Sequence, residues 1–107
     1  MKKVSILLVI FLILPAVVFA SYSDFQIVGV TVYSNLKGDS YAKVTVRNIS
    51  SGSRIIGSGD FVGIFADGAE RRGSGSSSVS VNPGETDTVM VEFGNYKWPL
   101  ESVKLSI

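Results

Sequence analysis

The chain has 107 residues with a formal net charge of +1, and it contains no cysteine and no histidine. The missing residue types exclude disulfide bonds, thiol or imidazole catalysis, Ser-His-Asp triads, and zinc, haem or copper sites with their usual ligands. The nearly balanced charge argues against a nucleic-acid-binding surface. We therefore predict that the protein is not an enzyme and has no catalytic residues, no cofactor and no metal site.

The first twenty residues have the features of a secretory signal peptide. Two lysines precede an apolar stretch from Val4 to Leu14, and Val18 and Ala20 fit the pattern at a processing site. We expect a helical signal peptide over residues 1–20 that is cleaved after Ala20, so that the protein is secreted or held outside the cytoplasm in the cell envelope. No cysteine follows the apolar stretch, which excludes a lipid-anchored lipoprotein.

An uncleaved membrane anchor is the alternative for this segment. Residues 4–20 approach the lower limit of about 17 apolar residues for a bilayer span, but Pro15 interrupts them. The protein would contact a membrane only if this anchor is retained. In either case residues 21–107 are long enough for one small domain and too short for two.

Alternating apolar residues predict two strands in the first half of this domain. The first spans residues 24–33 and has a bulge or a close backbone approach at Gly29. A polar loop over residues 34–40 connects it to the second strand, over residues 41–49. In the first strand we expect one face to carry Val28, Val30 and Val32 and the other to carry Ile27, Thr31 and Tyr33. In the second strand we expect Ala42, Val44 and Val46 to face inward and Lys43, Thr45 and Arg47 to face solvent.

Residues 60–66 predict a strand that is apolar on both faces, so we expect it to lie centrally in a sheet. It ends at Asp67-Gly68, which favours a tight hairpin because both central positions of that turn need positive φ. Residues 69–72 would return beside it. A short edge piece at residues 54–56 precedes this hairpin, and a flexible loop over residues 73–77 follows it.

The stretch from Ser78 to Phe93 predicts a strand, a turn and a second strand. Asn82-Pro83-Gly84-Glu85 supplies its turn, because Pro fixes φ and Gly tolerates positive φ. After the turn, the period of two predicts that Val89, Val91 and Phe93 share one buried face. Residues 100–107 alternate again and form a final strand.

The pattern as a whole predicts an all-β fold. Six or seven short strands are separated by turn signals at intervals of roughly ten residues, and no amphipathic helix follows Ala20. Such strands would form an antiparallel sandwich of two packed sheets.

Three motifs resemble the small immunoglobulin-like domains of prokaryotic cell envelopes, in particular the FxLYD-type and CARDB-type domains. They are the strand end Val44–Ser50, the central strand and turn Phe61–Gly68, and the Pro-Gly-Glu turn in Val81–Thr86. Phe65 stands where the FxLYD pattern has Tyr. The resemblance implies an immunoglobulin-like or fibronectin-III-like fold and a role in surface interaction, and it transfers no binding residues.

Asn48 begins Asn-Ile-Ser, an acceptor sequence for N-glycosylation, so it is a candidate modification site. The alternative is that Asn48 ends its strand through a side-chain hydrogen bond to the loop backbone. Because Asn and Ser favour turns with or without a glycan, the sequence leaves both roles open.

Four further residues are candidate partner contacts. Tyr96 and Trp98 lie together in the connection before the last strand, where an exposed aromatic ring could stack on a sugar or hold a partner's side chain. The alternative for Trp98 is a structural plug over one open end of the sandwich. Arg71 and Arg72 either grip an acidic partner or form a solvated edge that discourages strand-to-strand aggregation.

These observations favour a non-enzymatic interaction module that binds a protein or glycan on the cell envelope through loops or strand edges, for adhesion, assembly or accessory binding. The alternative is an immunoglobulin-like inhibitor of secreted peptidases. That alternative requires the loops at Ser51–Ser53, Asn82–Gly84 and Lys97–Pro99 to lie at one end of the domain. An enzyme is disfavoured because the carboxylates form neither a calcium-binding loop nor a recognisable catalytic pair.

Overall fold

The computed structural model describes residues 24–106, so the predicted signal peptide or anchor over residues 1–20 lies outside the described residues. The described chain is all-β and contains no α-helix, and none of its helical turns is long and apolar enough to cross a membrane. Its elements are β1 (Phe25–Ser34), β2 (Asp39–Asn48), β3 (Arg54–Gly57), the 3-10 turn η1 (Ser58–Asp60), β4 (Phe61–Phe65), β5 (Glu70–Arg72), β6 (Ser78–Val81), β7 (Thr86–Asn95) and β8 (Leu100–Leu105).

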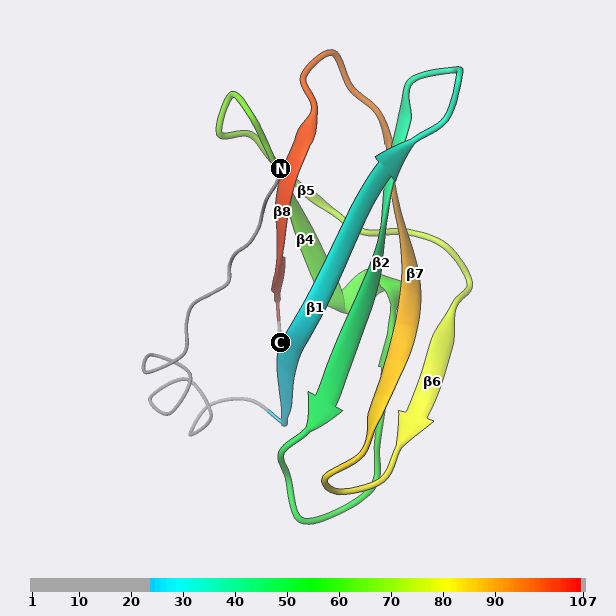
Figure 1. Cartoon of the computed structure of the whole chain (residues 1–107), viewed down its shortest axis with the longest axis vertical. Helices are drawn as coiled ribbons and strands as arrows, with labels where there is room; N and C mark the ends of the chain where they lie inside the picture. Colours follow the sequence, from blue (N-terminus) through cyan, green and yellow to red (C-terminus); the bar gives the residue numbers. More distant parts are fainter. Residues whose placement is uncertain (1–23, 107) are drawn as a thin grey trace.

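All strand pairs are antiparallel and form three groups (Figure 1). One sheet has the order β1-β2-β7, a second has the order β5-β4-β8, and β3 pairs with β6 as a two-stranded ribbon. The described residues therefore contain eight strands, where the sequence predicted six or seven in two sheets. The expected count was too low because the short pieces near residues 54–56 and 69–72 both form strands, as β3 and β5, and the pairing of β3 with β6 adds a third group.

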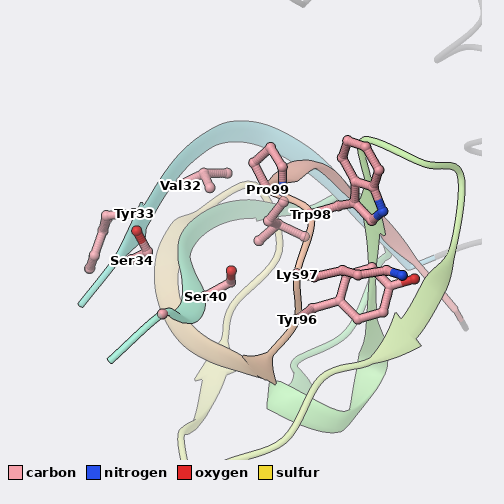
Figure 2. Close-up of a pocket in the computed structure, with 10 residues that line it drawn as sticks. Val32, Tyr33, Ser34, Ser40, Tyr96, Lys97, Trp98 and Pro99 are labelled. Carbon is pink, nitrogen blue, oxygen red and sulfur yellow. The ribbon is translucent and has the colours of Figure 1, made fainter. Parts of the chain in front are cut away.

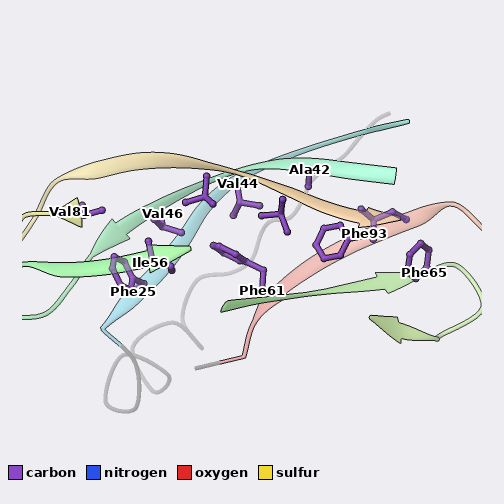
Figure 3. Close-up of a cluster of buried hydrophobic side chains, with 12 residues drawn as sticks. Phe25, Ala42, Val44, Val46, Ile56, Phe61, Phe65, Val81 and Phe93 are labelled. Atoms are coloured by element: carbon purple, nitrogen blue, oxygen red, sulfur yellow. The ribbon is translucent and has the colours of Figure 1, made fainter. Parts of the chain in front are cut away.

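The core lies between the two three-stranded sheets (Figure 3). Ala42, Val44 and Val46 of β2 are fully buried, which confirms the predicted inward face of this strand. The predicted face of β7 is confirmed as well, since its three apolar residues after the turn are at most 1% exposed. Across the core they face the large side chains Ile56, Phe61 and Phe65.

A bulge near the start of β1 changes which residues face the core. Ile27 pairs with Val46 and Val30 pairs with Val44, and the register shifts between Ile27 and Gly29. The bulge predicted at Gly29 is therefore confirmed. Because the extra residue reverses the alternation, Ile27 packs against the core while Val28 is 44% exposed. The predicted grouping of Val28 with Val30, with Ile27 on the opposite face, was wrong for this reason.

The β4–β5 hairpin forms where the sequence predicts it, but Asp67 and Gly68 are the third and fourth residues of the turn over residues 65–68, not its two central residues as expected. β4 lies between β5 and β8, which confirms its central position. Gly68 has φ of 89°, and its backbone nitrogen donates to the Phe65 carbonyl at 2.8 Å. The Asp67 carboxylate accepts from the Ala69 nitrogen at 3.0 Å, so both residues of the predicted dipeptide stabilise the turn.

Asn48 is the last residue of β2, and its side-chain amide is buried on the same inward face as Ala42, Val44 and Val46. Its Nδ2 donates to the carbonyls of Gly52 at 2.9 Å and Val81 at 2.7 Å. Its Oδ1 accepts from the backbone nitrogen of Ser50 at 2.8 Å and from the Ser50 hydroxyl at 2.7 Å. The side chain therefore ties the end of β2 to the following loop and to the end of β6.

The backbone of Asn48 holds the adjacent turn as well. Its nitrogen donates to the Glu85 carbonyl at 3.0 Å, and its carbonyl accepts from the Gly84 nitrogen at 2.8 Å. Residues 48–52 and residues 81–85, which are distant in the sequence, thus meet at one residue that is 0% exposed.

We predict that Asn48→Ala lowers the free energy of unfolding by about 2–4 kcal/mol, because it leaves buried carbonyl and N–H groups without partners. Urea denaturation measures this difference. Asn82→Ala is the matched control: Asn82 is exposed at the same end of the domain, and its loss should cost less than about 1 kcal/mol. Equal effects of the two substitutions would contradict the role assigned to the buried amide.

Candidate partner-binding pocket

An open pocket lies at the end of the domain opposite Asn48, between the end of β1, the start of β2 and the connection from β7 to β8 (Figure 2). It encloses about 330 Å³, and we call it the end pocket. Its lining residues are Val32, Tyr33, Ser34, Gly38, Ser40, Tyr96, Lys97, Trp98, Pro99 and Leu100.

The end pocket exposes apolar side chains that belong to the core face. Val32 pairs with the buried Ala42, so its side chain lies on the inward face of the sheet, yet it is 37% exposed. Trp98, in the facing connection, is 47% exposed. Among the described strands, neither β1 nor β8 has a partner along its outer edge, so no strand covers the core between them.

Ser40 is a pocket residue that the sequence analysis missed. We expected residues 34–40 to form a loop, but β2 begins at Asp39 and Ser40 pairs with Ser34 on one side and with Gly94 on the other. Ser40 is only 5% exposed, and its hydroxyl has no hydrogen-bond partner among the described residues. The signal was present, since Ser40 lies two residues before Ala42, in phase with the inward residues of β2.

Tyr96 lies in the same β7–β8 connection as Trp98, but it contacts the β4–β5 hairpin. Its ring lies 4.4 Å from the ring of Phe65, and its hydroxyl donates to Asp67 Oδ2 at 2.7 Å. This hydrogen bond is the main reason that the pKa of Asp67 is lowered, and it raises the pKa of Tyr96. Tyr96 thus fixes the β7–β8 connection to the β4–β5 turn.

Both arginines make contacts within the domain. Arg71 donates from Nη1 to the carbonyls of Phe93 at 3.1 Å and Asn95 at 3.2 Å, and its guanidinium lies 5.2 Å from the centroid of the Tyr96 ring. Arg72 donates from Nη1 to the Gly59 carbonyl at 2.7 Å and to the Ser106 hydroxyl at 3.0 Å.

The four predicted contact residues are therefore not gathered at one site. The structure brings Arg71 and Tyr96 together in a cluster with Phe65 and places Trp98 in the end pocket beside it. Arg72 binds a different part of the chain. Both arginines lie on β5, which is an edge strand, as the alternative for this pair expects.

The geometry of Asn48 favours a structural role over glycosylation. Its amide nitrogen is buried and donates to two carbonyls, so it is not accessible for modification in the folded domain. A glycan on Nδ2 would also replace one of the two hydrogens that make these bonds. The strand-ending hydrogen bonds predicted as the alternative are present.

The arrangement of loops does not meet the requirement of the peptidase-inhibitor alternative. The Ser53 hydroxyl donates to Asn82 Oδ1 at 2.7 Å, so the Ser51–Ser53 and Asn82–Gly84 loops lie together. The Lys97–Pro99 connection lies at the opposite end of the domain (Figure 1). The three loops thus do not form one edge that could enter a protease cleft.

Comparison with protein-family models, curated proteins and solved structures finds no match to this chain. The likeness to FxLYD-type and CARDB-type domains therefore rests on the sequence motifs. In residues 24–106, no group of three or more Asp or Glu side chains is placed to hold a metal ion.

We predict that Tyr96→Phe moves the pKa of Asp67 back toward its ordinary value, since the variant loses the largest cause of the lowering. The lowered pKa means that Asp67 favours the folded state at pH values above the ordinary carboxyl pKa, and that this contribution is lost as the pH falls through the folded-state pKa. NMR titration of the Asp67 carboxyl carbon measures the shift. Tyr41→Phe, on the outer face of the other sheet, is the control and should leave this titration unchanged.

Proposed function

We propose that the chain is a non-enzymatic interaction module, secreted or held in the cell envelope, that recognises a protein or glycan partner through the end pocket. Its fold would be an immunoglobulin-like or fibronectin-III-like sandwich, as its FxLYD-like and CARDB-like motifs suggest. Export is supported by the signal-peptide pattern of residues 1–20.

The observation that carries the proposal is the exposure of Trp98 beside core-facing valines. Trp98 makes no hydrogen bond or ring contact with a described residue and lies at the rim of an open pocket (Figure 2). Large aromatic side chains at such positions are typical of binding sites, because they bury much apolar area with little loss of side-chain entropy. Val32 lines the same pocket, and Val30, on the same face of β1, is also exposed.

The alternative role of Trp98 as a structural plug has less support. A plug gains its stabilising effect from burial, but nearly half of the Trp98 surface remains accessible. The neighbouring Tyr96 performs the structural task, since its ring packs on Phe65 and its hydroxyl binds Asp67. In this proposal Tyr96 stabilises the connection and Trp98 contacts the partner.

We predict that Trp98→Ala reduces capture of an envelope partner by about tenfold or more, while the free energy of unfolding changes by about 1 kcal/mol or less. The assay is quantitative capture from an envelope extract on the full chain as its host processes it, together with urea denaturation. Ile55→Ala is the matched control, because Ile55 is an exposed apolar residue on β3, outside the pocket.

Three results would contradict the proposal. If Trp98→Ala captures the partner as well as the wild-type chain does, the end pocket is not part of the binding surface. Loss of folding in that variant would assign Trp98 the role of a plug. A wild-type chain that captures nothing and remains a soluble monomer would argue against an interaction module.

A further inference from the structure

We propose that the end pocket binds one neutral pyranose ring of a glycan, with the Ser40 hydroxyl as a hydrogen-bond partner inside the pocket and the Trp98 indole at its rim. This inference rests on the proposed function and narrows the partner to a carbohydrate.

Ser40 is the first evidence for a polar ligand. It lies on the same inward face of β2 as Asn48, at the opposite end of the strand, and both side chains are buried. Every hydrogen-bonding group of the Asn48 amide has a protein partner, whereas the Ser40 hydroxyl has none among the described residues. Buried polar groups in folded proteins are nearly always hydrogen-bonded, so this hydroxyl, which lines an open pocket and has no partner among the described residues, is available to a polar ligand there.

The position of Ser40 on a central strand excludes an added β-strand as that partner. β2 is already paired with β1 through Ser34 and with β7 through Gly94. A strand from another protein would pair with an edge strand of a sheet, such as β1, β5, β7 or β8, and its main chain would not pair with β2, which carries Ser40. The ligand must therefore enter the pocket itself.

The pocket walls show what this ligand must offer. Val32, Pro99 and Leu100 present apolar surface, while Ser34 and Ser40 pair across the strands and place two hydroxyls on the same face. An apolar ligand would leave the buried Ser40 hydroxyl unsatisfied. A pyranose combines a C–H face, which suits the apolar walls and an aromatic ring, with hydroxyls that both donate and accept.

Charge and size favour a neutral single ring. Among the described residues that line the pocket, Lys97 is the only charged one. In Figure 2 it extends alongside Tyr96 and away from Ser40, and its charge contributes to the lowered pKa of Asp67. The volume of about 330 Å³ lies at the lower end of the range of about 300–1,000 Å³ for ligand pockets, which suits one ring rather than a longer oligosaccharide.

The test is an NMR titration of the isotope-labelled chain with four sugars: methyl glucopyranoside, methyl mannopyranoside, methyl galactopyranoside and N-acetylglucosamine. We expect at least one to cause saturable shifts of the amides of Val32, Ser34 and Ser40 and of the Trp98 indole, with no change around Asn48. Concentrations up to about 50 mM cover the weak affinity of a single sugar ring.

Ser40→Ala separates a ligand-binding role from a structural one. Because the hydroxyl has no protein partner, its removal should leave the melting temperature unchanged or raise it, and should weaken sugar binding about five- to tenfold, the effect of one lost hydrogen bond. Ser80→Ala is the matched control, since Ser80 is exposed on β6 and should change neither property.

The inference would be overturned if none of the four sugars gave saturable shifts, if the shifts lay outside the end pocket, or if Ser40→Ala lowered the melting temperature without weakening binding. These results are distinguishable from failure of the proposed function. If envelope capture depends on Trp98 but no sugar binds, the interaction module stands and the carbohydrate assignment fails. If capture does not depend on Trp98, the proposed function fails first.

Discussion

The buried amide of Asn48 is the interaction on which one end of the domain depends. Polar groups are costly to bury unless all of their hydrogen bonds are made, and here a single side chain satisfies the ends of β2 and β6 and the loop between β2 and β3. No disulfide restrains this end, because the chain has no cysteine. The hydrogen bonds of this one buried residue instead connect the end of β2 to the end of β6 and to the turn before β7.

The inward face of β2 differs between the middle of the strand and its two ends. Its middle residues are apolar and fully buried, whereas its two ends carry the polar residues Ser40 and Asn48. At one end the facing loops come together and satisfy Asn48. At the other end β1 and β8 leave the core uncovered, so Ser40 and Val32 line an open pocket. The difference lies in the loops around the strand, not in the strand itself.

This dependence on loops explains which parts could be predicted from the sequence. The faces of β2 and β7 and the turn at Asp67-Gly68 follow from alternation and from turn chemistry, which are local. The faces of β1 could not be read in the same way, because the single extra residue at Val28 reverses the alternation for Ile27. The burial of Ser40 depends on residues more than fifty positions away, and a polar residue next to a turn is ordinarily exposed.

The roles of the two aromatic residues in the β7–β8 connection could not be predicted from the local sequence either. Tyr96 and Trp98 look alike in the sequence, but only Tyr96 finds partners, namely Phe65, Asp67 and the guanidinium of Arg71. Arg71 also binds the Asn95 carbonyl, so the start of the connection is fixed from two sides. Trp98 is only two residues further along, so this cluster restricts where its backbone can lie. If the end pocket binds a partner as proposed, a rim that is ordered in advance loses less entropy on binding.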